Sequence, residues 1–268
     1  MNTVSRAVLA AGFAILFSCT GKEKTAEEQK EKPLAPEVVS MIKLVKQHPD
    51  SAGLRLRLAV ALDSSAHYGE ALAQMDSLIS RDSLNYGLWY SKAQVWEHSG
   101  DTSSAIRDYE RALRIYPAPE AQLSLANLFA ERRDVKAINI CENLNRLKLG
   151  REYDAHCAFI EGVYYARTGD TTRAIQQLDK CIANNYTYME AHIEKGLVYF
   201  DHKDYNKALE VFRFASSVNT LYADAYYYQA RAYEMMNKKD SALLRFKQAL
   251  SLDKNLTQAK EKIQQLQK

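Results

Sequence analysis

Residues 89–117 read WYSKAQVWEHSGDTSSAIRDYERALRIYP, and this stretch decides the fold. The pair Gly100–Asp101 favours a C-cap that ends a first helix and a tight turn that opens a second. The small residues Ala93 and Ala105 allow two antiparallel helices to approach closely, while larger apolar side chains fill the space around them. Pro117 closes the second segment. The stretch therefore predicts a helical hairpin.

The same register recurs along most of the chain. Marker alanines early in each second helix lie 34, 32, 37, 34 and 34 residues apart, at Ala71, Ala105, Ala137, Ala174, Ala208 and Ala242. The two irregular intervals flank a degenerate third copy, in which Arg133–Asp134 replaces Gly–Asp and one residue is missing. Each hairpin leaves one face uncovered and must stack on its neighbours, which predicts a quasi-one-dimensional solenoid.

This pattern resembles the tetratricopeptide repeat family, whose period is about 34 residues. The resemblance implies an all-α, right-handed superhelical solenoid of about six helix-turn-helix repeats over residues 52–256. The repeats are expected at 52–85, 86–118, 119–154, 155–188, 189–222 and 223–256. Apolar stripes predict capping helices at 36–51 and 257–268, and the short third copy predicts a change of superhelical pitch around 130–150.

The N-terminus carries one basic residue and then an apolar run that is too short to span a bilayer, which is typical of a signal peptide over residues 1–18. The segment Leu16–Phe17–Ser18–Cys19 resembles the lipobox of bacterial lipoproteins. This resemblance implies that Cys19 becomes the acylated N-terminus, followed by a charged, flexible tether over 19–35. The same resemblance implies sorting to the outer membrane, because Thr20 rather than Asp follows the cysteine. The alternative is an ordinary cleaved signal peptide with an incidental cysteine.

The composition excludes several classes of protein. The 268 residues include 36 Lys and Arg against 33 Asp and Glu, and this near-balance gives no electrostatic footprint for nucleic acid. An apolar share of 47% is that of an ordinary globular chain and excludes both overall disorder and a polytopic membrane protein. Only 10 Gly and 5 Pro occur, which disfavours an architecture of many strands and turns.

Motifs for catalysis, cofactors or metals are not found in the sequence. It has no Gly-rich phosphate loop, no Gly-x-Ser-x-Gly, no His-Glu-x-x-His and no pair of histidines spaced i, i+4. We therefore expect no enzyme, no cofactor and no metal site. The remaining cysteines Cys141, Cys157 and Cys181 fall in helix-patterned segments. They are predicted to be small buried hydrophobes, with one disulfide among them as the alternative.

Four Asp–Ser pairs resemble the O-glycosylation acceptors of certain periplasmic proteins. They begin at Asp50, Asp76, Asp82 and Asp240. Asp and Ser are also preferred at helix N-caps and turns, and capping is the favoured interpretation.

Candidate binding residues follow from the family resemblance, which places repeat positions five and nine of each first helix on the concave face. Position five is held by Leu56, Tyr90, Leu123, Phe159, Ile193 and Tyr227, and position nine by Val60, Gln94, Asn127, Val163, Leu197 and Arg231. An apolar and aromatic ladder with a few polar residues suits an extended peptide or a partner helix. The alternative is that neighbouring side chains cover one another.

Two functions remain open from the sequence. The first is a non-catalytic envelope lipoprotein that serves as a protein-interaction scaffold in envelope assembly, secretion or cell-wall enzyme regulation, held to the membrane through its lipid. The second is an envelope lipoprotein that binds a small ligand or glycan in an aromatic-rich cavity, since 17 residues are Tyr. An open groove would favour the first function, and a deep enclosed pocket the second. The sequence leaves the partner and the oligomeric state undetermined.

Overall fold

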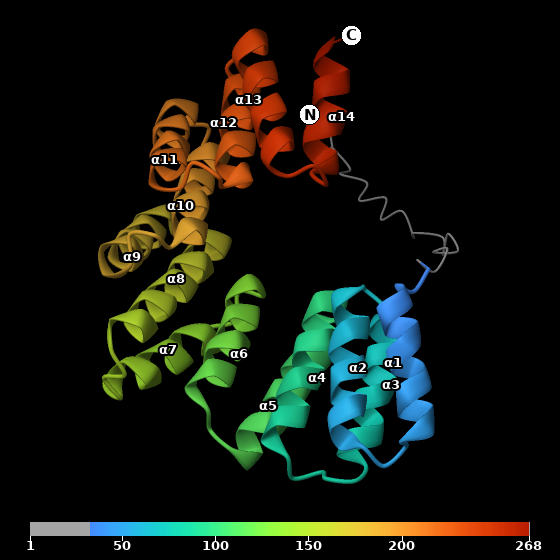
Figure 1. The fold of residues 1–268 in the computed structure, drawn as a ribbon. Coiled ribbons are helices and arrows are strands. Elements are labelled where there is room, and N and C mark those ends of the chain that lie inside the picture. The colour runs from blue at the N-terminus through green and yellow to red at the C-terminus, as the bar shows by residue number, and fades with distance from the viewer. Residues whose placement is uncertain (1–32, 268) are drawn as a thin grey trace, which may run out of the picture. The chain divides into compact units, whose positions relative to one another are not determined.

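The computed structural model describes residues 33–267, and within that range the chain forms fourteen helices and no strand. The signal peptide, Cys19 and nearly all of the tether that the sequence predicts lie outside the described residues. Twelve helices form six consecutive hairpins (Figure 1). These are α2 (Ala52–Ser64) with α3 (Tyr68–Ile79), α4 (Tyr86–Ser99) with α5 (Thr102–Ile115), α6 (Pro119–Glu131) with α7 (Lys136–Arg146), α8 (Arg151–Thr168) with α9 (Thr171–Asn184), α10 (Met189–Asp201) with α11 (Tyr205–Val218), and α12 (Ala223–Met235) with α13 (Lys239–Leu252).

The contacts between helices run in chain order. Each helix packs against the next one, so the described chain is an all-α solenoid of helical repeats, as the sequence predicts. One helix lies at each end, α1 (Pro36–Gln47) against α2 and α14 (Thr257–Gln267) against α13. The apolar side of α14 buries Ala259 and packs Ile263 and Leu266 against the last hairpin, while its other side carries polar residues. The final repeat is thereby shielded from water.

Each hairpin closes on a small residue of its first helix. Repeat position eight is Ala or Gly in all six copies and lies against a residue of the second helix four positions after the marker alanine. These facing residues are all almost completely buried, at Met75, Tyr109, Cys141, Leu178, Phe212 and Phe246. At Gly196 an added Cβ would lie 2.1 Å from Cε1 of Phe212, and at Gly162 one would lie 2.7 Å from Cγ of Leu178. The small residue is therefore what lets the two helices meet.

The turn inside each hairpin has one backbone geometry throughout, although only two copies have glycine there. One or two positions after the end of the first helix, one residue has a positive φ between 57° and 86°, at Ala66, Gly100, Arg133, Gly169, Lys203 and Asn237. The next residue then donates its N–H to the carbonyl five residues back, as Asp101 does to Trp96 at 3.0 Å and Asp134 to Phe129 at 2.8 Å. The third copy thus makes the same turn with Arg133 in the left-handed conformation.

The third repeat differs in how its second helix starts. Ala137 donates its N–H to the carbonyl of Asp134, three residues back, at 3.1 Å. In the second repeat Ala105 donates instead to Asp101, four residues back, at 3.0 Å. The missing residue therefore tightens the start of α7 into a 3₁₀-type turn. In addition, α8 begins at Arg151, before the repeat start expected at Ala155, and α6 packs directly on α8 as well as on α7.

Candidate functional site

The first-helix face is the surface that repeat positions five and nine of α2, α4, α6, α8, α10 and α12 were predicted to form. On α2 these positions hold Leu56 and Val60, one helical turn apart, with 36% and 53% of their surface exposed. Two apolar side chains that are exposed to solvent one turn apart on the same helix are available to a partner. The first repeat therefore presents the most accessible apolar part of the face.

The middle of the face is half-buried. Tyr90 stacks on Tyr86, with ring centroids 5.7 Å apart, and lies 5.6 Å from the ring of Tyr109. Phe159 stacks on Tyr188 at 5.1 Å. These aromatic side chains serve the packing between helices while leaving part of their surface open. Gln94, Leu123, Asn127 and Leu197 are likewise half-buried.

Toward the C-terminus the predicted ladder is mostly covered. Val163, Ile193 and Tyr227 are buried in the core clusters of their own and neighbouring repeats. Arg231 is half-buried, and its Nε lies 3.3 Å from Oε2 of Glu234. A partner bound to this conformation would therefore touch the face mainly through the first three repeats. Neighbouring side chains cover one another in the later ones.

A charged network on the first helices was missed by the sequence analysis. Arg167 on α8 binds Glu131 on α6 through two hydrogen bonds of 2.8 and 3.0 Å, and it also pairs with the buried Glu194 on α10. Burial opposes the charge on Arg167, but hydrogen bonds to the two carboxylates outweigh it and raise the pKa of the guanidinium. One side chain therefore joins three consecutive repeats. The sequence did contain a signal for this network, because Glu131 and Arg167 carry opposite charges at the same position of successive repeats.

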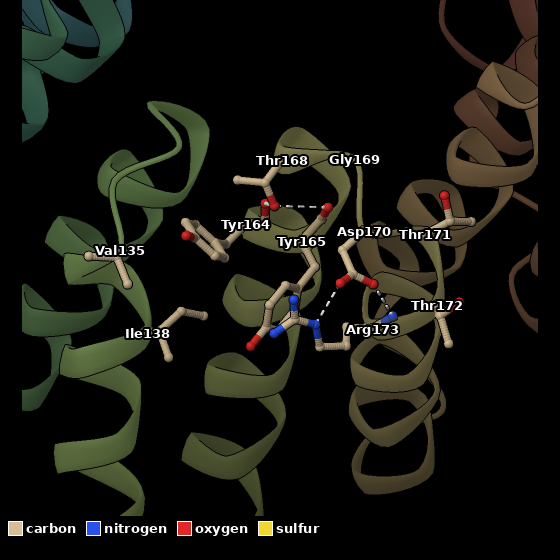
Figure 2. Close-up of a pocket in the computed structure, with 10 residues that line it drawn as sticks. All are labelled: Val135, Ile138, Tyr164, Tyr165, Thr168, Gly169, Asp170, Thr171, Thr172 and Arg173. Atoms are coloured by element: carbon tan, nitrogen blue, oxygen red, sulfur yellow. Dashed lines mark hydrogen bonds and ion pairs between the residues drawn. The ribbon is translucent and has the colours of Figure 1, made fainter.

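A hollow of about 670 Å³ lies beside the short turn of the third repeat (Figure 2). Val135 and Ile138 at the start of α7 form one side, and Tyr164 and Tyr165 of α8 form another. The guanidinium of Arg173 lies 4.4 Å from the ring centroid of Tyr165 and pairs with Asp170 at 2.6 Å. One face of the Tyr165 ring is therefore covered by Arg173.

Comparison with known proteins settles the family. A family model described as tetratricopeptide repeat matches residues 56–118, 99–137, 159–215 and 193–256. The chain belongs to the tetratricopeptide repeat family. Members of this family are protein-interaction scaffolds whose domains bind protein or peptide partners. No curated protein matches the chain.

Several solved structures share the fold. One is a tetratricopeptide repeat protein from Parabacteroides merdae, with a TM-score of 0.70 and 16% identity over 86% of this chain and 91% of that one. Another is PilW, a type IV pilus biogenesis factor, with a TM-score of 0.60 and 16% identity over 82% and 99%. A third is the Cut9–Hcn1 complex of APC/C, with a TM-score of 0.61 and 17% identity over 87% and 46%. At these identities the similarity concerns the fold alone.

The cysteines and the Asp–Ser pairs of this tetratricopeptide repeat protein can now be placed in the fold. Cys141, Cys157 and Cys181 are free, buried thiols, and Cys141 occupies the core position that larger apolar residues hold in the other repeats. Ser51 caps α2 by accepting the N–H of Leu54 at 3.4 Å, as the capping interpretation expects. That interpretation is wrong for Asp76–Ser77, which lies inside α3, and for Asp240–Ser241, which lies in the first turn of α13 without a side-chain cap. Among residues 33–267, no group of three His, Cys, Asp or Glu side chains is arranged to hold a metal ion, and no helix is long and apolar enough to cross a membrane.

Proposed function

We propose that this tetratricopeptide repeat protein is a non-catalytic scaffold of the bacterial cell envelope that holds a protein or peptide partner on its first-helix face. The observation that carries the proposal is the exposed pair Leu56 and Val60, which continues into the half-buried Tyr90, Gln94 and Asn127. Apolar anchors bordered by polar groups supply most of the binding energy in such interfaces. The partner serves envelope assembly, secretion or the regulation of cell-wall enzymes.

The proposed anchor is a lipid on Cys19, supported by the lipobox-like segment that ends at this residue. One acyl chain binds a membrane only marginally, whereas a diacylglyceryl group supplies two chains and a stable attachment. The charged residues of 19–35 then separate the folded repeats from the lipid headgroups. We place the protein in the outer membrane, since Thr20 rather than Asp follows the cysteine.

Substitution Cys19→Ala is expected to abolish the lipid anchor. We expect the wild-type chain to sediment with the membrane fraction. The variant is expected either to move to the soluble fraction or to keep its signal peptide uncleaved, in both cases without an acyl chain. Metabolic labelling with a fatty acid and mass spectrometry of the N-terminal peptide measure the modification. Substitution of the buried Cys181 by Ala is the control that removes another thiol. Acylation of the Cys19→Ala chain would contradict the anchor.

The scaffold function is tested by placing charges on the exposed pair. The double substitution Leu56→Asp/Val60→Asp is expected to reduce partner recovery about tenfold or more, because two apolar anchors are replaced by groups that must stay hydrated. The measurement is affinity purification from detergent-solubilised envelopes with quantitative mass spectrometry.

The matched control is Leu84→Asp/Leu244→Asp. These two leucines are also exposed, but one lies between α3 and α4 and the other on the second helix α13. The control adds the same charge away from the first-helix face and is expected to recover partners as the wild type does. Equal recovery with both double variants would contradict binding through Leu56 and Val60.

A small ligand or glycan is the weaker alternative. The hollow in Figure 2 is large enough to admit one, and it contains two tyrosines. A sugar would need an open ring face for stacking, and Arg173, held by Asp170, covers one face of Tyr165, so one of the two tyrosines offers less ring surface to a ligand. This contact favours the scaffold over the ligand-binding function.

A further inference from the structure

A second cleft, with a volume of about 310 Å³, lies on the second repeat away from the predicted binding positions. It is lined by Trp89 and Lys92 of α4 and by Arg107, Arg111 and Arg114 of α5, with Asp108 among them. The three arginines are spaced i, i+4 and i+7, so they share one side of α5. Neither α4 residue is at position five or nine of its repeat. We call this the basic cleft.

A buried carboxylate organises the basic cleft. Asp108 is only 3% exposed and accepts a hydrogen bond from the indole Nε1 of Trp96 at 3.0 Å. Its carboxylate oxygens also lie 3.6 Å from Nζ of Lys92 and 3.7 Å from Nε of Arg107. Lys92 is held further by Asp76 of α3, at 2.7 Å. Two of the four cations are therefore fixed in place by carboxylates from the protein itself.

The other two cations have no carboxylate partner among the described residues. Arg111 and Arg114 are exposed, and within residues 33–267 no carboxylate lies within 4.0 Å of either guanidinium. Arg111 stands 5.5 Å and Lys92 5.4 Å from the ring centroid of Trp89, whose indole N–H donates to the carbonyl of Ser83 at 2.9 Å. The cleft therefore offers positive charge beside a fixed aromatic ring.

The chemistry of these groups indicates carboxylates as the ligand. Guanidinium groups bind carboxylates through paired hydrogen bonds, and the Trp89 ring beside Arg111 and Lys92 helps to position these two cations. Phosphate sites are commonly built with backbone N–H groups at helix N-termini, whereas every cation here comes from a side chain within α4 or α5. We propose that the basic cleft binds an acidic segment of a protein partner, with Arg111 and Arg114 pairing its carboxylates. This second contact point is separate from the first-helix face.

The test titrates an oligoglutamate peptide into the full-length protein in a nonionic detergent at low ionic strength. Calorimetry measures affinity, and the intrinsic fluorescence of Trp89 and Trp96, both of which lie beside Asp108 or the cleft, is followed as a second signal. We expect saturable binding that weakens as salt is added, and a loss of about tenfold or more in affinity for Arg111→Gln/Arg114→Gln. Both side chains are exposed, so the variant is expected to unfold at the wild-type temperature.

The control Arg57→Gln/Arg146→Gln removes the same charge from the exposed surfaces of α2 and α7 and is expected to keep wild-type affinity. Leu56→Asp/Val60→Asp is expected to keep it too, which separates this cleft from the first-helix face. Equal loss in both arginine double variants would overturn the proposal, because it would show diffuse charge attraction. Undetectable peptide binding would overturn it as well, as would tighter binding of inorganic phosphate or of vesicles containing phosphatidylglycerol at the same arginines.

Discussion

Substitution of Gly196 by alanine is expected to lower the free energy of unfolding by about 3 kcal/mol, a large effect for one added methyl group. The new Cβ would lie 2.1 Å from Cε1 and 2.6 Å from Cδ1 of Phe212. The ring cannot move aside easily, because Phe212 is fully buried and stacks on Tyr228 with centroids 5.4 Å apart. Helices α10 and α11 would have to separate instead.

The measurement for Gly196→Ala is chemical denaturation followed by circular dichroism, compared with Gly53→Ala. A Cβ at Gly53 on α2 would meet no atom within 4 Å, so that substitution is expected to stabilise the protein by up to about 1 kcal/mol through helix propensity. Each repeat buries its apolar surface mainly against its neighbours. If α10 and α11 separate, the adjoining repeats are therefore expected to lose buried surface as well. An unchanged midpoint for Gly196→Ala would show that the fifth hairpin does not depend on close contact at this glycine.

Substitution of Arg167 by methionine is expected to cost about 3 kcal/mol, because it leaves the carboxylate of Glu194 buried and unpaired. Methionine keeps much of the length of the side chain, so most of the effect reports on charge. Glu131→Gln is the matched comparison and is expected to cost less than about 1 kcal/mol, since Glu131 is exposed and can be hydrated.

A double-mutant cycle separates the ion pair from general packing. We expect Arg167→Met/Glu194→Gln to recover a substantial part of the stability lost in Arg167→Met, because the unpaired buried charge is then removed. Thermal unfolding of the four proteins measures the coupling. Additive losses would mean that Arg167 and Glu194 do not stabilise each other.

The repeat architecture could be predicted from the sequence because it depends on local rules. Small residues such as Ala93 and Ala105 recur in a fixed register, and each marks where two helices must approach closely. The turn of the third copy could be placed as well, since Arg133 falls at the position that glycine holds at Gly100 and Gly169. Its left-handed conformation is imposed by the helices on both sides rather than by its own preference.

Exposure on the first-helix face could not be predicted in the same way. Position five is exposed at Leu56 and buried at Ile193 and Tyr227, although all three hold apolar residues in the same register. Ile193 and Tyr227 are buried in clusters that include residues of neighbouring repeats, and contacts of this kind are not encoded within a single repeat. The start of α8 at Arg151 was missed for a similar reason, because the repeat template contains no extra helical turn there.

The most direct test of the scaffold function is site-specific photo-cross-linking in living cells. A photoreactive amino acid replaces Val60 on the first-helix face, and in a second strain it replaces Leu244 on α13, which is also exposed. We predict a discrete covalent adduct with a partner protein from position 60 and none of the same mass from position 244. Adducts formed only from position 244, or equally from both, would contradict a partner bound on the first-helix face.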